Sequence, residues 1–299
     1  MRKSRPAMDF APFTLIPGET RNMVLESPHH GRWVPPECLV HSRLAKAARR
    51  RWDNHIAIAE EFLLWNVGGV VVASRYSRLV CDLNRGADRV DARVCPRWPG
   101  ARIYEDGGVI VPFLRTRRRV VRLYDPPLEP EEVEKRLRRY WYPYHDELRK
   151  RVEENVKRFG QAVLISLHST NPLPAHAQEL RPVIYLGTDQ GRSCDAAVLL
   201  AMQSILEQSG CRVITQGFYQ GAFVTQAYGR EPRVQAVQIE LDRRYLSQSK
   251  IARWKMLEPL AAALRAVTVA EKSPALPRFR RVPASRTYMD PLTGDVWRW

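Results

Sequence analysis

Short apolar runs and longer amphipathic stretches alternate along this chain. The runs predict strands, because four to eight apolar residues bounded by Gly, Pro or polar residues are typical of strands buried in a sheet. They lie at residues 22–27, 70–73, 162–168, 183–186, 211–215 and 234–241. The stretches between them predict helices at 53–65, 125–143, 144–159, 196–208 and 247–270, with a break or kink at Pro143.

Strands that alternate with helices predict a mostly parallel sheet covered on both faces. We therefore expect an α/β protein with a single domain over residues 1–271, which begins with an extended arm at 1–20. Residues 109–122 are β-like but rich in arginine, which indicates an edge strand or an excursion. The remaining residues, 272–299, hold four prolines and six lysines or arginines and predict an extended tail.

The composition is that of a soluble globular protein, with 44% hydrophobic and 27% charged residues. No apolar stretch approaches the roughly 18 residues of a membrane span, and no apolar segment follows the basic N-terminus as in a secretory signal. The five cysteines are scattered and lack CxxC spacing, which is typical of reduced thiols. We therefore expect a cytoplasmic protein with no membrane partner.

The formal net charge of +16 indicates either a nucleic-acid-binding surface or a preference for small anionic substrates. The densest basic runs, 49–51 and 115–122, lack the interleaved aromatic residues of a stacking surface. No helix-turn-helix, RNA-recognition or zinc-finger signature is present. Small anionic substrates are therefore the stronger expectation, and the sequence leaves the oligomeric state open.

Three of the predicted strands end in residues that suit metal-dependent hydrolysis. The first is followed by His29 and His30, another ends at His168, and a third carries Glu240. In open α/β sheets, ligands bind beyond the carboxyl ends of the strands. Two histidines and a glutamate at such ends are the parts of a mononuclear zinc hydrolase.

Several short motifs occur in one order along the chain, and together they make a family resemblance. The motifs are Ser27-Pro28-His29, Arg78 to Arg85 (RLVCDLNR), Tyr140 to Leu148 (YWYPYHDEL), Leu167-His168-Ser169, Leu186 to Asp195 (LGTDQGRSCD), Gly221 to Thr225 (GAFVT), Tyr228-Gly229 and Gln238 to Arg243 (QIELDR). Over roughly residues 22–250 the chain resembles the N-formylglutamate amidohydrolase (N-formylglutamate deformylase) family. The resemblance implies a three-layer α/β/α fold with a mostly parallel, mixed central sheet. That fold is zinc-carboxypeptidase-like (phosphorylase/hydrolase-like) and is also found in aspartoacylases.

Four departures from the family pattern fall near the expected substrate pocket. His30 stands where the family has serine, and no acid precedes His168. A Gly-Gly pair is here Gly221-Ala222, and Gln226 occupies a place where the family has a basic residue. These departures leave the exact substrate open.

The resemblance implies zinc as the cofactor, with His29 and His168 as ligands. Related zinc carboxypeptidases take a third ligand from a glutamate three residues after the first histidine, but that position is Arg32. Asp53 is our candidate for the third ligand, and its alternative role is a helix N-cap. For His30 we expect an orienting or substrate-contacting role.

The resemblance assigns the remaining site residues as well. Glu240 is the expected general base, and its alternative is a structural ion pair with Arg243. Asn84 and Arg85 are expected to contact the substrate, because a guanidinium holds a carboxylate or steadies an oxyanion. Arg192 is a second candidate for binding the substrate's carboxylate.

The sequence therefore predicts a zinc-dependent amidohydrolase that hydrolyses the amide bond of an N-formylglutamate-like N-acyl amino acid or a similar small anionic amide. One alternative is a catalytically diverged member that binds a ligand or nucleic acid. The other is a peptidase or a different deacylase on the same scaffold.

Overall fold

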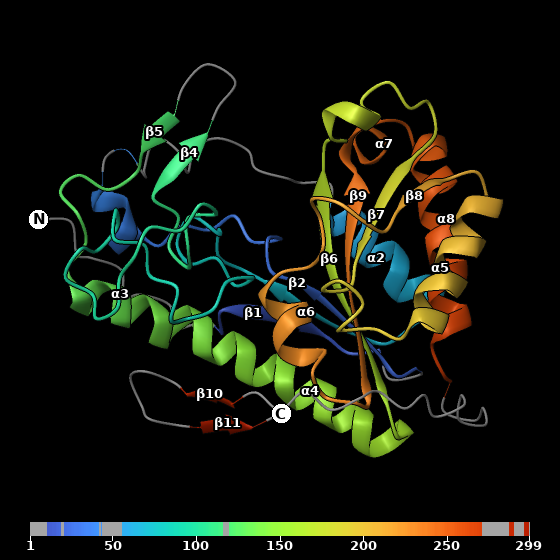
Figure 1. Cartoon of the computed structure of the whole chain (residues 1–299), viewed down its shortest axis with the longest axis horizontal. Helices are drawn as coiled ribbons and strands as arrows, with labels where there is room; N and C mark the ends of the chain where they lie inside the picture. The colour runs from blue at the N-terminus through green and yellow to red at the C-terminus, as the bar shows by residue number, and fades with distance from the viewer. Residues whose placement is uncertain are drawn as a thin grey trace, which may run out of the picture.

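A seven-stranded mixed sheet forms the centre of the computed structural model (Figure 1). The structure describes residues 11–18, 21–41, 43, 56–115, 120–270, 287–289 and 296–298. The strands, in sheet order, are β1 (Phe13–Ile16), β3 (Val70–Ser74), β2 (Met23–Ser27), β6 (Ala162–Thr170), β9 (Val234–Asp242), β7 (Val183–Gly187) and β8 (Arg212–Ile214). Four neighbouring pairs are parallel, while β1 with β3 and β7 with β9 are antiparallel.

Helices cover both faces of this sheet, which confirms the predicted three-layer α/β class (Figure 1). One face packs against α2 (Ile56–Val67), α5 (Ala196–Gln208) and α8 (Lys250–Val267). The other packs against α4 (Tyr142–Phe159) and α6 (Phe223–Tyr228). Successive residues of a strand point to opposite faces of the sheet. Because helices cover both faces, the inner strands are buried along their whole length, and their sequences are nearly continuous apolar runs.

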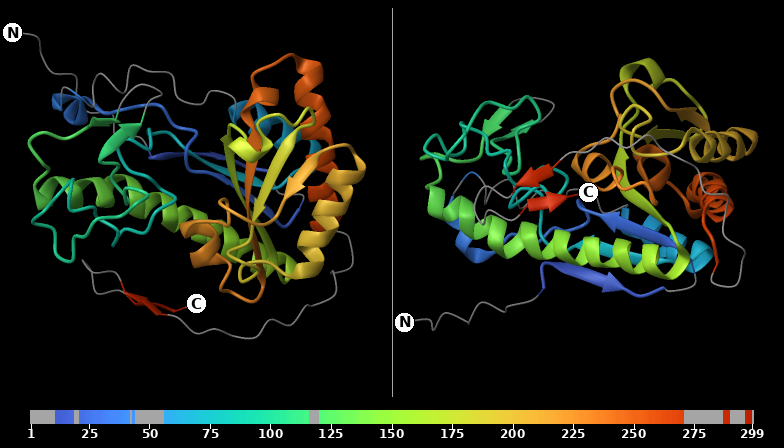
Figure 2. Two further views of the ribbon diagram at one scale, coloured as in Figure 1. Left: turned by 45° about the horizontal axis from the view of Figure 1, so that its top comes forward. Right: turned by 60° about the horizontal axis from the view of Figure 1, so that its bottom comes forward.

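Beside the sheet lies a lobe of turns and short elements formed by residues 76–115 and 120–136 (Figure 2). It contains the hairpin β4 (Phe113–Arg115) and β5 (Val120–Arg122), which is the predicted excursion, and the helix α3 (Pro130–Arg136). Its turns are held by Asp91, which accepts hydrogen bonds from Arg93 and from the Tyr104 amide. Burial opposes ionisation of this carboxyl, but these bonds prevail and lower its pKa.

Of the extended arm predicted at residues 1–20, residues 11–18 are described, and Phe13–Ile16 pairs there with β3 as an edge strand; the rest of the predicted arm lies outside the described residues. The sequence predicts a break or kink at Pro143. The irregular turn lies just before that residue, where a π-helical turn, Leu137–Trp141, joins α3 to α4. Proline lacks the N–H that a continuous helix needs, so a wider turn before Pro143 keeps the two helices connected.

The shorter elements complete the described chain. They are η1 (Pro36–Val40), η3 (Pro174–His176), α7 (Arg243–Leu246), and the paired strands β10 (Thr287–Met289) and β11 (Val296–Arg298) within the predicted tail. All five cysteines are buried and free, in agreement with the prediction of reduced thiols. Within the described part of the chain, no helix is long and apolar enough to cross a membrane.

Candidate functional site

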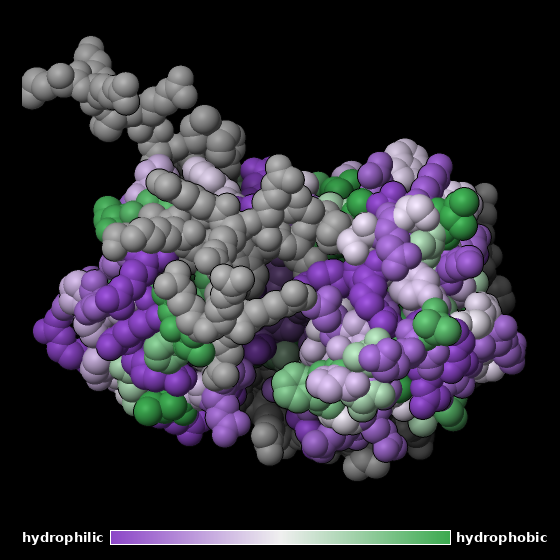
Figure 3. All heavy atoms as spheres, turned by 90° about the horizontal axis from the view of Figure 1, so that it is seen from above, coloured by the Kyte–Doolittle hydropathy of each residue, from purple (hydrophilic) through white to green (hydrophobic). Residues whose placement is uncertain are grey.

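The carboxyl ends of β2, β6 and β9 meet at one edge of the sheet, beside the lobe. Seen from that side, hydrophilic residues border a hollow in the surface (Figure 3). A cavity of about 440 Å³ opens there and is lined by His29, His168 and Glu240, together with Asn84 and Arg85 of the lobe. His168 and Glu240 are direct partners in the parallel β6–β9 ladder, which places the two side chains next to each other. The structure thus brings together five of the predicted site residues.

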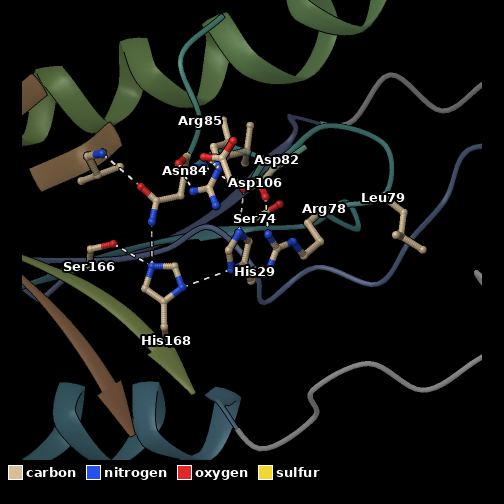
Figure 4. A network of polar contacts seen from close by, with 12 residues as sticks. His29, Ser74, Arg78, Leu79, Asp82, Asn84, Arg85, Asp106, Ser166 and His168 are labelled. Carbon is tan, nitrogen blue, oxygen red and sulfur yellow. Dashed lines mark hydrogen bonds and ion pairs between the residues drawn. The ribbon is translucent and has the colours of Figure 1, made fainter. Parts of the chain in front are cut away.

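The imidazoles of His29 and His168 face each other through their Nδ1 atoms, which are 3.1 Å apart (Figure 4). The Nε2 atom of His29 lies 2.8 Å from an oxygen of Asp82. The Nε2 atom of His168 lies 3.0 Å from both Asn84 Nδ2 and Ser166 Oγ. Burial lowers the pKa of both imidazoles, and the positive charge of Arg78 lowers each further. Both rings are therefore neutral near pH 7.

Asp82 is the residue that orients His29. Its buried carboxylate accepts hydrogen bonds from the Arg78 guanidinium and, at 3.1 Å, from the backbone N–H of Asn84. Burial alone would raise its pKa, but the charge of Arg78 holds the pKa of Asp82 well below its usual range. Asp82 belongs to the Arg78-to-Arg85 motif, but the sequence prediction gave it no role. An acid within an otherwise apolar stretch was the signal that could have identified it.

The pair of histidines fits a zinc ion. Two nitrogens bound to one tetrahedral zinc lie about 3.3 Å apart, close to the spacing of the two Nδ1 atoms. The Nε2 atom of His29 faces the Asp82 carboxylate, as is usual for metal-binding histidines, while Nε2 of His168 contacts Ser166 Oγ and faces the side-chain nitrogen of Asn84. The described residues contain no group of three metal-binding side chains, and Asp53 lies outside them. Among the described residues, the spacing of the two Nδ1 atoms suits two of the roughly three protein ligands expected for a catalytic zinc.

Asn84 connects the histidine pair to the far wall of the cavity. Its Oδ1 accepts a hydrogen bond from the Val224 amide at 3.0 Å. Its Nδ2 donates to Gln238 Oε1 at 3.2 Å and faces His168. Since both ends of this amide have protein partners, its orientation is set before any substrate enters.

Arg85 lines the cavity, where the predicted contact with the substrate is possible. Its guanidinium is already paired with the carboxylate of Asp106. Its Nε lies 2.9 Å from one oxygen of Asp106, and Arg89 Nη2 lies 2.9 Å from the other. One acid thus holds two guanidinium groups at the cavity wall. Sequence reasoning missed Asp106 and Arg89, because both lie in a non-periodic segment that carries no local signal of a site.

Glu240 lies in the apolar strand β9 with only 7% of its surface exposed. Gln238 Nε2 donates to its Oε1 at 3.2 Å, and the carboxylate borders the cavity. Arg243, the predicted alternative partner, donates to the Ser169 carbonyl at 2.8 Å and also lines the cavity. A carboxylate at this position can accept a proton from a water molecule inside the cavity.

Two predicted substrate-binding residues do not line this cavity. His30 points to α2, where its Nδ1 lies 2.7 Å from Glu60, and this contact raises its pKa. Arg192 is half exposed; its Nε and Nη2 donate to the two oxygens of Asp189, and its Nη1 donates to Gln190 Oε1. Each of these side chains binds a neighbouring acid and lies outside the cavity lining, so the structure does not support the predicted contact of either with the substrate.

Behind His168 stands a second buried acid, Glu26. Ser166 Oγ, which contacts His168, also hydrogen-bonds to Glu26 on the adjacent strand β2. Tyr144 donates to the other oxygen of Glu26 at 2.7 Å. Burial raises the pKa of Glu26 to about 8, although the hydrogen bonds of Ser166 and Tyr144 oppose this shift.

Replacing Glu26 with Gln is expected to change how stability depends on pH. The folded protein keeps a proton on Glu26 up to about pH 8, whereas the unfolded chain loses it near pH 4.3. Stability therefore falls as pH rises through this window, by about 5 kcal/mol. Glu26→Gln keeps the size of the side chain but does not titrate. It should therefore remove the decrease in the free energy of unfolding that Glu26 causes as pH rises.

Urea unfolding of chelator-treated protein between pH 5 and 8 measures this effect. The exposed Glu153 on α4 offers a matched Glu153→Gln control, which should follow the wild-type pH dependence. Equal pH slopes for wild type and Glu26→Gln would contradict the expectation.

Comparison with known proteins places this geometry among amidohydrolases. A model of the N-formylglutamate amidohydrolase family matches residues 21–247. The N-formylglutamate deformylase of Pseudomonas putida is 30% identical over 226 residues, which cover 73% of this chain and 79% of that protein. The N-formylglutamate deformylase of Pseudomonas aeruginosa is 30% identical over 251 residues, which cover 82% and 89%.

Two solved structures share the fold. The N-formylglutamate amidohydrolase of Ralstonia eutropha JMP134 superposes with a TM-score of 0.72 at 25% identity, covering 86% of this chain and 97% of the other. A gene product of Agrobacterium tumefaciens superposes with a TM-score of 0.59 at 19% identity, covering 87% and 97%. The three-layer architecture is therefore that of solved relatives along most of both chains.

Proposed function

The chain belongs to the N-formylglutamate amidohydrolase family, and from this premise we propose that it is a zinc-dependent enzyme that hydrolyses the amide bond of a small anionic N-acyl amino acid. N-formylglutamate is the first substrate to test, because it gives the relatives their name. The observation that carries the proposal is the facing pair His29 and His168 with Glu240 beside it in the same cavity.

In this proposal His29, His168 and Asp53 hold the metal. Zinc, when bound, supplies a Lewis acid that polarises the acyl carbonyl and lowers the pKa of water. Asp82 keeps His29 in the tautomer that leaves Nδ1 without a proton, because the ring nitrogen facing the carboxylate carries it. Behind His168, Ser166 links the Nε2 atom to Glu26, and Asn84 contacts the same ring nitrogen.

The other residues act on the substrate and on protons. Glu240 accepts the proton of the attacking water and returns it to the leaving nitrogen, which leaves as an amine. Arg85 and Arg89 form the positive end of the cavity and bind the substrate's carboxylate. This places the scissile amide between the arginines and the histidine pair.

A metal assay joined to a substrate panel tests the proposal. Purified protein, with and without added zinc, is analysed for bound metal and then for hydrolysis of N-formyl, N-acetyl and N-succinyl amino acids. About one zinc per chain and hydrolysis that a chelator abolishes and zinc restores are the expected results. Failure to bind zinc even after supplementation would exclude the metal mechanism, and no hydrolysis across the panel would exclude the amidohydrolase activity.

A further inference from the structure

One wall of the cavity carries no charge. Residues 213–229 form an unbroken stretch without a single Asp, Glu, Lys, Arg or His, in a chain in which 27% of residues are charged. Within it, residues 218–223 and Gln226 line the cavity, and we call this set the neutral wall. It offers the rings of Phe218, Tyr219 and Phe223 and the amides of Gln220 and Gln226. A side chain placed against this wall meets aromatic faces and amide groups.

The opposite end of the cavity is positive, but most of its charge is already balanced. Arg85 and Arg89 share the single carboxylate of Asp106, which leaves one net positive charge for the three groups. Arg78 is balanced by Asp82 beneath it. This end of the described cavity therefore attracts one carboxylate.

The charges nearest the neutral wall also cancel. Glu240 and Arg243 border the cavity together with Tyr219, and their opposite formal charges sum to zero. A substrate carboxylate against the neutral wall would lose its hydration. Among the described residues it would find no cation whose charge is not already balanced, and burying a carboxylate without such a partner costs free energy. An amide or an aromatic ring would meet no such penalty.

We propose that the preferred substrate carries one carboxylate, held by Arg85 and Arg89, and an uncharged amide or aromatic side chain, held by the neutral wall. The inference rests on the proposed function, since it names the substrate class of that same site. It means that a second carboxylate, as in N-formylglutamate, is disfavoured relative to the amide of the same shape.

N-formylglutamine and N-formylglutamate provide the direct test, because they differ only in an amide against a carboxylate. We expect kcat/KM for N-formylglutamine, and for N-formylphenylalanine, to exceed that for N-formylglutamate by about tenfold or more, the size of effect expected when a group is buried without its partner. Equal values, or a preference for N-formylglutamate, would overturn the inference and leave the proposed function intact. Hydrolysis of none of the three would instead contradict the proposed function.

A charge-gain variant tests the wall itself. Gln226 is exposed on α6 and lines the cavity, so Gln226→Arg adds a cation there. It should raise kcat/KM for N-formylglutamate relative to N-formylglutamine by about tenfold. Gln216 lies in the same uncharged stretch but borders a separate cavity, so Gln216→Arg is the matched control and should leave the ratio unchanged. An equal shift in both variants, or none in Gln226→Arg, would overturn the assignment of the neutral wall.

Discussion

Glu240→Gln is expected to lower kcat by about 10²–10⁴-fold while the protein keeps its fold and its metal. Gln has the shape of Glu and can still meet Gln238, but it cannot accept a proton from water. Because Glu240 lies beside His168 in the ladder and borders the cavity, its carboxylate is placed to serve the reacting atoms. Turnover of the best N-formyl amino acid, measured alongside bound zinc, checks this result.

The matched control for Glu240→Gln is Glu207→Gln at the end of α5. Glu207 is an exposed carboxylate on the surface, where it accepts a hydrogen bond from Gln203, and it does not line the cavity. It should retain wild-type turnover. If Glu240→Gln kept its zinc and turned over substrate at the wild-type rate, Glu240 would not be the base.

His168→Gln should weaken zinc binding by more than about 100-fold and abolish hydrolysis at ordinary zinc concentrations. The variant removes one of the two Nδ1 donors and leaves the other on His29. Loss of a direct ligand should exceed the roughly 10–100-fold effect of losing a residue that only orients a ligand. Metal content after dialysis, and titration of the chelator-treated protein with zinc, measure the change without relying on turnover.

His176 supplies the control for this experiment. Its Nδ1 faces the hydroxyl of Tyr185 at 3.2 Å, and it does not line the cavity, so His176→Gln should bind zinc as the wild type does. Asp53→Asn, tested in the same titration, examines the predicted third ligand. Wild-type zinc affinity in His168→Gln would remove the histidine pair as the metal site.

Local patterns were enough to predict the parts of the site that stand at strand ends. His29, His168 and Glu240 follow apolar runs, and parallel strands deliver their ends to one edge of the sheet. The family motifs added Asn84 and Arg85, which the structure places at the same cavity. These predictions needed only the strand pattern and the order of the motifs along the chain.

Contacts between distant segments decided what the sequence could not. The acid expected before His168 is absent from β6, yet Glu26 reaches Ser166 from β2 through the register of the two strands. Asp106 reaches Arg85 because the lobe brings both residues to the wall of the cavity. Neither pairing leaves a periodic trace, since each joins residues that are far apart in sequence.

Proximity in the sequence was also misleading at two positions. His30 follows His29 directly, but the chain turns its side chain toward Glu60 on α2. Arg192 lies in a family motif, but its side chain binds Asp189, which stands three residues earlier in the chain.

By itself, the sequence determined the α/β class and the strand-end residues, because burial and hydrogen bonding within each element leave local apolar runs and helical periodicity. The order of its motifs indicated the family. Only the tertiary structure decided which acids orient the two histidines, and which charges in the cavity balance one another. These features depend on distances between side chains from separate elements, and such distances exist only once the sheet and the lobe have packed together.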